Sequence, residues 1–142
     1  DDALASHLNK VYLKHRFEDI ELFDDALPVL KKLKEKYILG VLSNGNSYPG
    51  RCGLDNIFQF IVFSQDYGFE KPDPRLFQIA LEKAECSKAE LLHVGDSLDT
   101  DIMGAINAGV KCVWLDRKKE KDKLNLRIDY EISSLMELLA LI

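Results

Sequence analysis

The stretch LLHVGDSLDTDIMGAINAG, residues 91–109, joins an interior strand to a cluster of carboxylates. Its opening run is mostly apolar, and Gly95 and Asp96 follow directly. Asp99 and Asp101 come next, at the start of a helical pattern. In α/β proteins, functional sites lie at the carboxyl ends of parallel strands. A buried strand that ends in several carboxylates therefore indicates such a site.

The rest of the chain alternates between strand and helix patterns. Near-continuous apolar runs are typical of strands that are covered on both faces of a parallel sheet. They predict strands at residues 37–43, 60–64, 91–95, 110–116 and 128–132, with helices at 2–18, 24–37, 74–86, 98–108 and 133–142. This order predicts an α/β fold with a parallel sheet and right-handed crossovers.

Local signals mark the ends of the predicted helices. Asp24 or Asp25 is expected to cap the helix at 24–37. Gly109 is expected to end the helix at 98–108 in the left-handed conformation. Gly104 and two nearby alanines predict a helix face that packs closely against the sheet.

Composition restricts the classes of protein that fit. The 142 residues are 46% hydrophobic and 30% charged, which fits one globular domain with a core of its own. The formal net charge is −5, so a broad affinity for nucleic acid is not expected. The basic run at 117–123 is interrupted by acidic residues and predicts a solvated loop.

Cysteine usage and hydropathy point to a cellular compartment. Cys52, Cys86 and Cys112 have no pairing or metal-binding spacing. No stretch resembles a signal peptide or is apolar over a length that spans a bilayer. We therefore expect a protein of the cytosol that does not bind membranes.

A first candidate for ligand binding is the turn Ser43-Asn44-Gly45, which follows the strand predicted at 37–43. A hydroxyl and free backbone N–H groups in one turn suit an anion such as phosphate. The same three residue types also form ordinary turns, so the motif alone leaves both interpretations open.

A second candidate is Lys71 in the stretch EKPDPRLF, residues 70–77. Pro72 favours an extended backbone at Lys71. Asp73 is a natural N-cap and Pro74 a natural first helical residue. The lysine is thus fixed just before a helix, where its ammonium group is either aimed at a nearby anion or simply exposed on the surface.

The third candidate is the pair Asp96 and Asp101. Two carboxylates gathered at one strand end repel each other unless a cation or a donor holds them. Mg²⁺ prefers such oxygen ligands and leaves room for waters and a substrate phosphate. The alternative is that these aspartates only cap the helix or interact with its dipole. We accept that alternative for Asp99 and favour a metal for Asp96 with Asp101.

Taken together, these motifs resemble the haloacid dehalogenase superfamily, from about Leu22 to about Asp116. The resemblance implies a Rossmann-like core and phosphoryl transfer through an aspartyl-phosphate intermediate. It implies that Ser43 and Asn44 bind the phosphoryl oxygens. The roles implied for the other residues are charge neutralisation by Lys71, coordination of Mg²⁺ by Asp96, and binding of metal-bound water or orientation of the lysine by Asp101.

Within the superfamily, the stretch GDSLDTD looks like that of phosphatases. The metal-free dehalogenases are similar at LSNGN and KPDPR but lack the glycine-aspartate pair of the fourth motif, which Gly95 and Asp96 supply here. The spacing to Asp101 and the phrase INAGVKCVWL look most like the nucleotidase and sugar-phosphate phosphatase branches with a helical cap.

One part of the family pattern is missing from the sequence. The family's first motif is a strand that ends in Asp-x-Asp and supplies the nucleophile, and no such strand precedes Ser43. Residues 1–21 then look like a remnant of a helical cap, and residues 22–142 like the C-terminal part of the core. In the family, the missing strand is central, between the strands that end at Ser43 and Gly95, so both would expose an unpaired edge.

These observations predict a Mg²⁺-dependent hydrolase of small phosphorylated metabolites, of which this chain is a proteolytic or engineered remnant or to which another chain supplies the strand. The chain alone is then expected to be inactive. Alternatives are a non-catalytic phosphate- and Mg²⁺-binding module and a dehalogenase-type hydrolase. A receiver-type signalling domain would need an aspartate at a strand end where this chain has Ser43 and Ser64.

Overall fold

The computed structural model describes residues 22–45, 49–119 and 125–142. The helix predicted at 2–18 and the cap remnant predicted at 1–21 lie outside these residues. The α-helices are α2 (Ala26–Lys34), α3 (Pro74–Ala84), α4 (Met103–Ala108) and α5 (Leu138–Leu141); the strands are β1 (Gly40–Ser43), β2 (Phe60–Phe63), β3 (Leu92–Gly95), β4 (Lys111–Leu115) and β5 (Tyr130–Ile132). Short 3-10 turns are η1 (Pro49–Cys52), η2 (Ser64–Asp66), η3 (Lys88–Glu90) and η5 (Leu135–Glu137), and η4 (Leu98–Ile102) is a π-helical turn.

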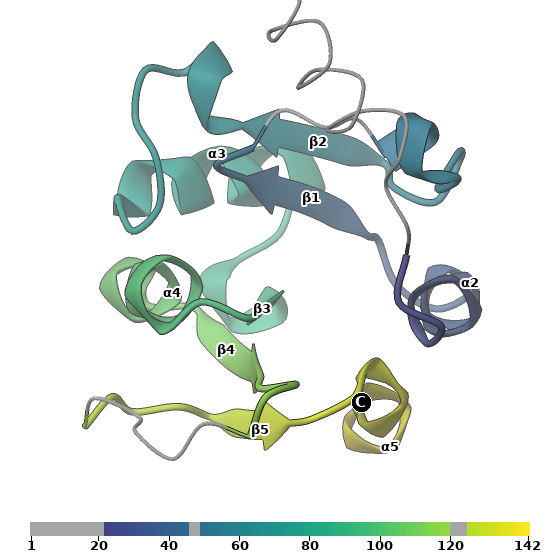
Figure 1. Cartoon of the computed structure of the whole chain (residues 1–142). Coiled ribbons are helices and arrows are strands. Elements are labelled where there is room, and N and C mark those ends of the chain that lie inside the picture. The colour runs from purple at the N-terminus through teal and green to yellow at the C-terminus, as the bar shows by residue number, and fades with distance from the viewer. Residues whose placement is uncertain (1–21, 46–48, 120–124) are drawn as a thin grey trace, which may run out of the picture.

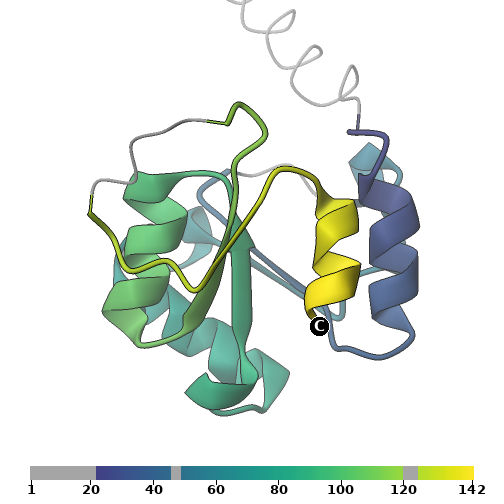
Figure 2. The same ribbon diagram turned by 90° about the horizontal axis from the view of Figure 1, so that it is seen from below.

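All described strand pairs are parallel, as the sequence predicted. β1 pairs with β2, while β3, β4 and β5 form a second sheet in that order. Helices α2 and α5 lie together on one side of the strands, and α3 and α4 lie on the other (Figure 1). Figure 2 shows the same two helical layers from below. The molecule is therefore an α/β protein with helices on both faces of its strands.

Two apolar clusters hold these layers together. One packs α3 and α4 against β4, with Phe77, Ile102 and Trp114 almost completely buried. The other packs α2 and α5 against β4 and β5, around Val29 and Val113. Because β4 contributes alternate side chains to both clusters, it is the strand most completely enclosed.

The two sheets are separated between β1 and β3. No ladder joins these two strands among the described residues. Most residues of β1 and all four of β3 are only half-buried, unlike the centre of β4. A cavity of about 430 Å³ lies beside them, lined largely by aliphatic side chains that include Leu39, Leu42, Leu92 and Val94. Among the described residues, the inner edges of the strands that end at Ser43 and Gly95 are therefore unpaired, as predicted.

Several local predictions hold where the structure describes them. The Asp73 carboxylate accepts a hydrogen bond from the Arg75 N–H at 2.9 Å, so it caps α3. Gly109 ends α4 with φ 72°. Gly104 does pack closely, but against α3 and not the sheet: a Cβ at this position would lie 2.7 Å from the Phe77 ring.

The prediction that Asp24 or Asp25 caps α2 with its side chain is wrong. Asp25 occupies the N-cap position but makes no side-chain bond to α2. Its carboxylate accepts two hydrogen bonds from the Arg117 guanidinium, at 2.9 and 3.0 Å. It also accepts from the Ser134 hydroxyl and the Leu135 N–H, which lie at the start of η5. Asp25 therefore fastens the start of α2 to the segments that follow β4 and β5.

Arg117 also differs from the solvated residue that was expected in the run at 117–123. Its guanidinium carbon lies 3.9 Å from the centre of the Phe23 ring, a cation–π contact, and its side chain is only 24% exposed. The hydrogen bond from Arg117 is the main reason that the pKa of Asp25 falls to about 2, and bonds from Leu135 and Ser134 add to it. Of this run, residues 120–124 lie outside the described part.

Among the described residues, no helix is both long and apolar enough to cross a membrane. Cys86 and Cys112 are free thiols.

We predict that Asp25→Asn lowers the free energy of unfolding at pH 7 by about 2 kcal/mol, because it leaves Arg117 without its ionic partner. Since the folded-state pKa of Asp25 is depressed, its contribution is present above the unfolded pKa of about 3.9 and is lost as pH falls towards about 2. Urea unfolding at several pH values should show that the variant loses less stability than the wild type between about pH 4 and 2.

The adjacent, exposed Asp24 provides the matched control, and Asp24→Asn should behave like the wild type. Equal unfolding curves for the two variants would contradict this role of Asp25.

Candidate functional site

Four of the five predicted site residues line one cavity at the carboxyl edge of the strands. Ser43 ends β1 and Asp96 follows β3. Lys71 and Asp101 reach the same space from the segment before α3 and from within η4. The cavity measures about 530 Å³ and adjoins the gap between β1 and β3, with which it shares lining residues. The parallel arrangement thus gathers motifs that lie far apart in the sequence.

The centre of this site is a buried ion pair. The Lys71 ammonium group contacts Oδ1 of Asp101, and the two side chains are only 8% and 9% exposed. A lysine and an aspartate are seldom buried to this degree unless they are paired, because an isolated charge in the interior is costly. The pair therefore places a positive charge at a defined point in the cavity.

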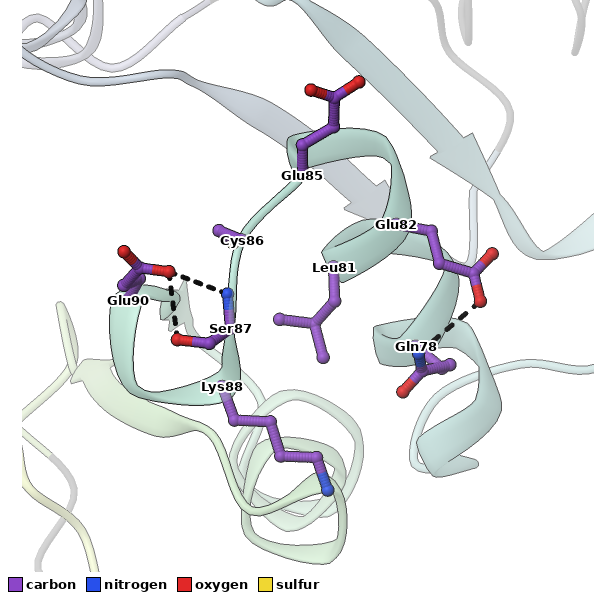
Figure 3. A pocket seen from close by; sticks show the side chains of 8 residues that line it. All are labelled: Gln78, Leu81, Glu82, Glu85, Cys86, Ser87, Lys88 and Glu90. Atoms are coloured by element: carbon purple, nitrogen blue, oxygen red, sulfur yellow. Dashed lines mark hydrogen bonds between the residues drawn. The ribbon is translucent and has the colours of Figure 1, made fainter.

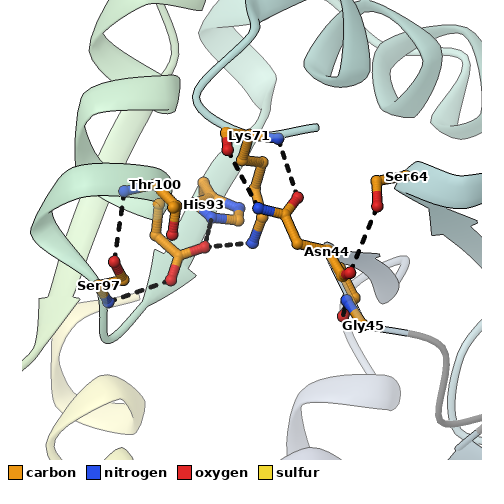
Figure 4. A network of polar contacts seen from close by, with 9 residues as sticks. Asn44, Gly45, Ser64, Lys71, His93, Ser97 and Thr100 are labelled. Atoms are coloured by element: carbon orange, nitrogen blue, oxygen red, sulfur yellow. Dashed lines mark hydrogen bonds and ion pairs between the residues drawn. The ribbon is translucent and has the colours of Figure 1, made fainter. Parts of the chain in front are cut away.

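Asn44 holds the backbone of Lys71 in place. Its side-chain amide donates to the Lys71 carbonyl at 3.0 Å, and its side-chain oxygen accepts from the Lys71 N–H at 2.9 Å (Figure 4). The Ser64 hydroxyl donates in turn to the Asn44 carbonyl at 3.4 Å. The Asn44 side chain thus joins the end of β1 to the segment before α3, a role that the sequence did not predict.

The Ser43 hydroxyl is oriented by the turn that follows it. Its oxygen accepts a hydrogen bond from the Gly45 N–H at 2.9 Å. A hydroxyl group both donates and accepts, so this contact leaves its hydrogen available to donate to a ligand. Ser43 is accordingly suited to bind an anion that enters the cavity.

Gly95 provides the space that Asp101 occupies. A Cβ at Gly95 would lie 2.3 Å from both Cβ and Cγ of Asp101. Oδ2 of the aspartate accepts a hydrogen bond from the Ser97 N–H at 3.1 Å. The sequence indicated that Gly95 removes bulk beside Asp96, whereas the room is needed by Asp101.

His93 also belongs to this site, and the sequence reasoning missed it. Its Nε2 atom lies 3.1 Å from Oδ1 of Asp101, the same oxygen that contacts Lys71 (Figure 4). Within the apolar run 91–95 it was read only as part of a strand. The signal that could have identified it is a single imidazole in a run that is otherwise free of polar side chains up to Gly95.

These neighbours determine the protonation of Asp101. Burial on its own would raise the pKa of this carboxyl group, but the hydrogen bond from His93 and the charge of Lys71 outweigh it. The net effect is a pKa well below the usual range for aspartate, so the group is ionised at neutral pH.

The two carboxylates differ in what they offer to a metal. Asp96 is exposed, and the bond that it makes within the described residues uses its backbone carbonyl, which accepts from the Trp114 indole at 3.1 Å. Both oxygens of Asp101 already accept hydrogen bonds. In the described part of the chain, no group of three or more potential ligands is gathered. Asp96 thus offers a carboxylate to a hard cation such as Mg²⁺, which would take its other ligands from water, phosphate or a further carboxylate.

A further pocket lies at the C-terminal end of α3 and contains none of the predicted site residues. It is lined by Gln78, Leu81, Glu82, Glu85, Cys86, Ser87, Lys88 and Glu90 (Figure 3). Glu90 accepts from both the N–H and the hydroxyl of Ser87, which makes it part of a capping box. Burial raises the pKa of the Cys86 thiol, which disfavours the reactive thiolate.

The site thus belongs to an α/β protein that carries a serine, a lysine and carboxylates at the carboxyl edge of its parallel strands. A family model described as haloacid dehalogenase-like hydrolase matches residues 2–115. The chain belongs to this family, which confirms the resemblance that the motifs predicted.

Individual relatives extend this result. The pyrimidine 5'-nucleotidase YjjG of Escherichia coli K12 is 30% identical to this chain over 137 residues, covering 92% of the chain and 61% of that protein. This and other related phosphatases support the predicted phosphatase branch.

Solved structures agree with the fold. A 2-haloacid dehalogenase from Pseudomonas syringae pv. tomato DC3000 superimposes with a TM-score of 0.89 at 33% identity, covering 97% of this chain and 60% of the other. The HAD-hydrolase YfnB from Bacillus subtilis, solved bound to magnesium, gives 0.79 at 30% identity and covers 84% and 55%. The chain thus spans less than two thirds of each of these relatives.

We predict that Gly95→Ala lowers the free energy of unfolding by about 1 to 3 kcal/mol, because the new methyl group displaces the Asp101 side chain. Urea unfolding measures this loss. Gly45→Ala is the matched control just after β1, since among the described residues its Cβ would approach only the Ser43 hydroxyl, at 3.2 Å. If both variants were equally stable, the close approach at Gly95 would not constrain Asp101.

Proposed function

We propose that this chain is part of a Mg²⁺-dependent hydrolase that acts on small phosphorylated metabolites. The observation that carries the proposal is the buried Lys71–Asp101 pair, held beside the Ser43 hydroxyl in one cavity. A fixed ammonium group and a free hydroxyl hydrogen at the same edge are suited to the negative oxygens of a phosphoryl group.

Each residue has a defined part in this proposal. Ser43 donates to a phosphoryl oxygen, and Lys71 neutralises negative charge on the group that is transferred. Asp101 orients the lysine, and Asn44 fixes the lysine backbone. Mg²⁺, held by Asp96 together with water and phosphate, would supply further positive charge as a Lewis acid.

The nucleophile must come from outside the described residues. We propose that a parallel strand ending in Asp-x-Asp fills the gap between β1 and β3, supplied by an upstream segment or by another chain. The half-buried strands and the aliphatic cavity beside them support this, because a central strand would pair with both inner edges and fill the space between them. Its aspartate would carry the phosphoryl group between the ester and water.

The composition and the free thiols support a cytosolic protein that binds neither nucleic acid nor membranes. The free thiols of Cys86 and Cys112 fit the reducing conditions of that compartment. In the proposed hydrolase, the cap would determine which phosphorylated substrate binds.

A second candidate activity is dehalogenation. The observation that favours it is the close superposition with the Pseudomonas syringae dehalogenase. The exposed carboxylate of Asp96 supports the phosphatase instead, since the metal-free dehalogenases that the motifs resemble lack this glycine-aspartate pair.

We expect the 142-residue chain alone to show no Mg²⁺-dependent hydrolysis of p-nitrophenyl phosphate. Co-expression with a polypeptide that carries an apolar strand ending in Asp-x-Asp should produce turnover. Asp96→Asn and Lys71→Met should each reduce that turnover by at least two orders of magnitude, since each removes charge stabilisation of the transferred group. Lys88→Met, in the pocket beyond α3, is the control and should retain full activity.

Other outcomes would reject parts of the proposal. Turnover by the chain alone that Asp96→Asn abolishes would show that the nucleophile is already present. An assembled complex that binds phosphate without turnover would support a non-catalytic module, and halide release from 2-chloropropionate would support the dehalogenase.

A further inference from the structure

His93 is a half-buried titratable residue to which no motif assigns a role. Its side chain is 12% exposed, and it lines both the site cavity and the gap between β1 and β3. We propose that His93 is a positioning residue, which donates from Nε2 to Asp101 and thereby fixes the carboxylate that holds Lys71. The catalytic consequence of this positioning rests on the function proposed above.

The hydrogen-bond pattern around Asp101 specifies the direction of each contact. Oδ1 accepts hydrogen bonds from Lys71 and His93, and Oδ2 accepts one from the Ser97 N–H. An ionised carboxylate is acceptor-only, so the imidazole must carry a hydrogen on Nε2 to make this contact. The tautomer therefore follows from the network.

The ring of His93 is itself held rigidly. It lies edge-on to the Phe77 ring, with ring centres 4.9 Å apart and planes at 76°. Phe77 is fully buried in the cluster between α3 and α4, and the backbone of His93 is paired with Cys112 in β4. A donor that is fixed by packing on one side and by a strand on the other is a pre-organised support for a site residue.

The loss of this donor would affect Lys71 through Asp101. With His93 in place, the carboxylate is held at Oδ1 and Oδ2 by partners from β3 and the turn after it. Without it, the Ser97 N–H still holds Oδ2, but Oδ1 would be held only by the flexible lysine that it is meant to position. Lysine has a long side chain with high rotamer entropy, so its ammonium group depends on a fixed partner for a fixed position.

The test uses the ¹⁵N-labelled chain without any phosphate. An ammonium group that is buried and ion-paired exchanges its hydrogens slowly, so Lys71 Nζ should give a resolved NMR cross-peak, assigned by its loss in Lys71→Arg. His93→Phe keeps a ring against Phe77 but removes the donor, and should abolish or broaden the cross-peak. His93→Gln retains an N–H donor and should restore it at least in part.

Val94→Ala provides the matched control. Val94 is the next residue of β3 and packs in the cluster with α2 and α5, so its truncation weakens the fold without touching Asp101. The cross-peak should survive in this variant. A cross-peak in His93→Phe with the wild-type shift and intensity would overturn the proposal, because the imidazole would then only fill space.

A second measurement keeps the proposal testable if His93→Phe does not fold. Long-range ¹H–¹⁵N spectra of the wild-type ring should show the hydrogen on Nε2, and a ring with hydrogen only on Nδ1 would overturn the proposal. Both spectra are recorded without substrate. A failure here would reject the positioning role alone, whereas absence of turnover in the assembled complex would reject only the proposed activity.

Discussion

The ion pair between Lys71 and Asp101 is the interaction on which the rest of the site depends. Two opposite charges that are more than nine-tenths buried must satisfy each other and their remaining hydrogen-bonding capacity. The Ser97 N–H and His93 make further hydrogen bonds to the Asp101 carboxylate. The Asn44 side chain hydrogen-bonds to both the N–H and the carbonyl of Lys71. The need to bury this pair explains why Gly95 has no side chain, since any Cβ would occupy the position of Asp101.

The separation of the strands into two sheets is the second feature that determines the geometry of the site. The site lies at the carboxyl edge of β1 on one side and of β3 on the other, and the two strands do not pair within the described residues. The helical layers and their apolar clusters still hold the two halves of the site at one cavity. The contacts from Asn44 to the Lys71 backbone cross from the β1 side to the segment before α3, and the ion pair continues from there to η4. Polar contacts thus bridge the space between sheets that lack a common ladder.

Local patterns predicted much of the fold, because they depend on residues that are close in sequence. Apolar runs marked the strands, and Asp73, Pro74 and Gly109 marked helix ends through bonds to their own neighbours. The sequence also predicted that the motif residues lie close together, because parallel strands bring their carboxyl ends to one edge whatever the intervening sequence. The role of Asp25 was predicted wrongly because its partner Arg117 lies 92 residues away, and a local pattern cannot indicate such a contact.

His93 and Gly104 were missed or misread for related reasons. His93 is part of a strand, and the apolar periodicity gives no sign that one imidazole contacts a carboxylate eight residues later. Gly104 did signal a close approach, but its partner depends on how α4 packs against α3, which is a tertiary choice. Asn44 contributes through its side chain to a backbone 27 residues away. In each case the residue type suggested a special role, but the sequence did not identify the residue that it contacts.

The central claim is that Ser43, Asn44 and Lys71 form an anion site at the edge of this chain. The most direct measurement is a titration of the ¹⁵N-labelled chain with inorganic phosphate, followed by amide and ammonium NMR shifts. The account predicts saturable shifts at residues 43–45 and at Lys71 that disappear in Lys71→Met. Shifts centred on Lys88 and the pocket beyond α3, or shifts at residues 43–45 that persist unchanged in Lys71→Met, would contradict it.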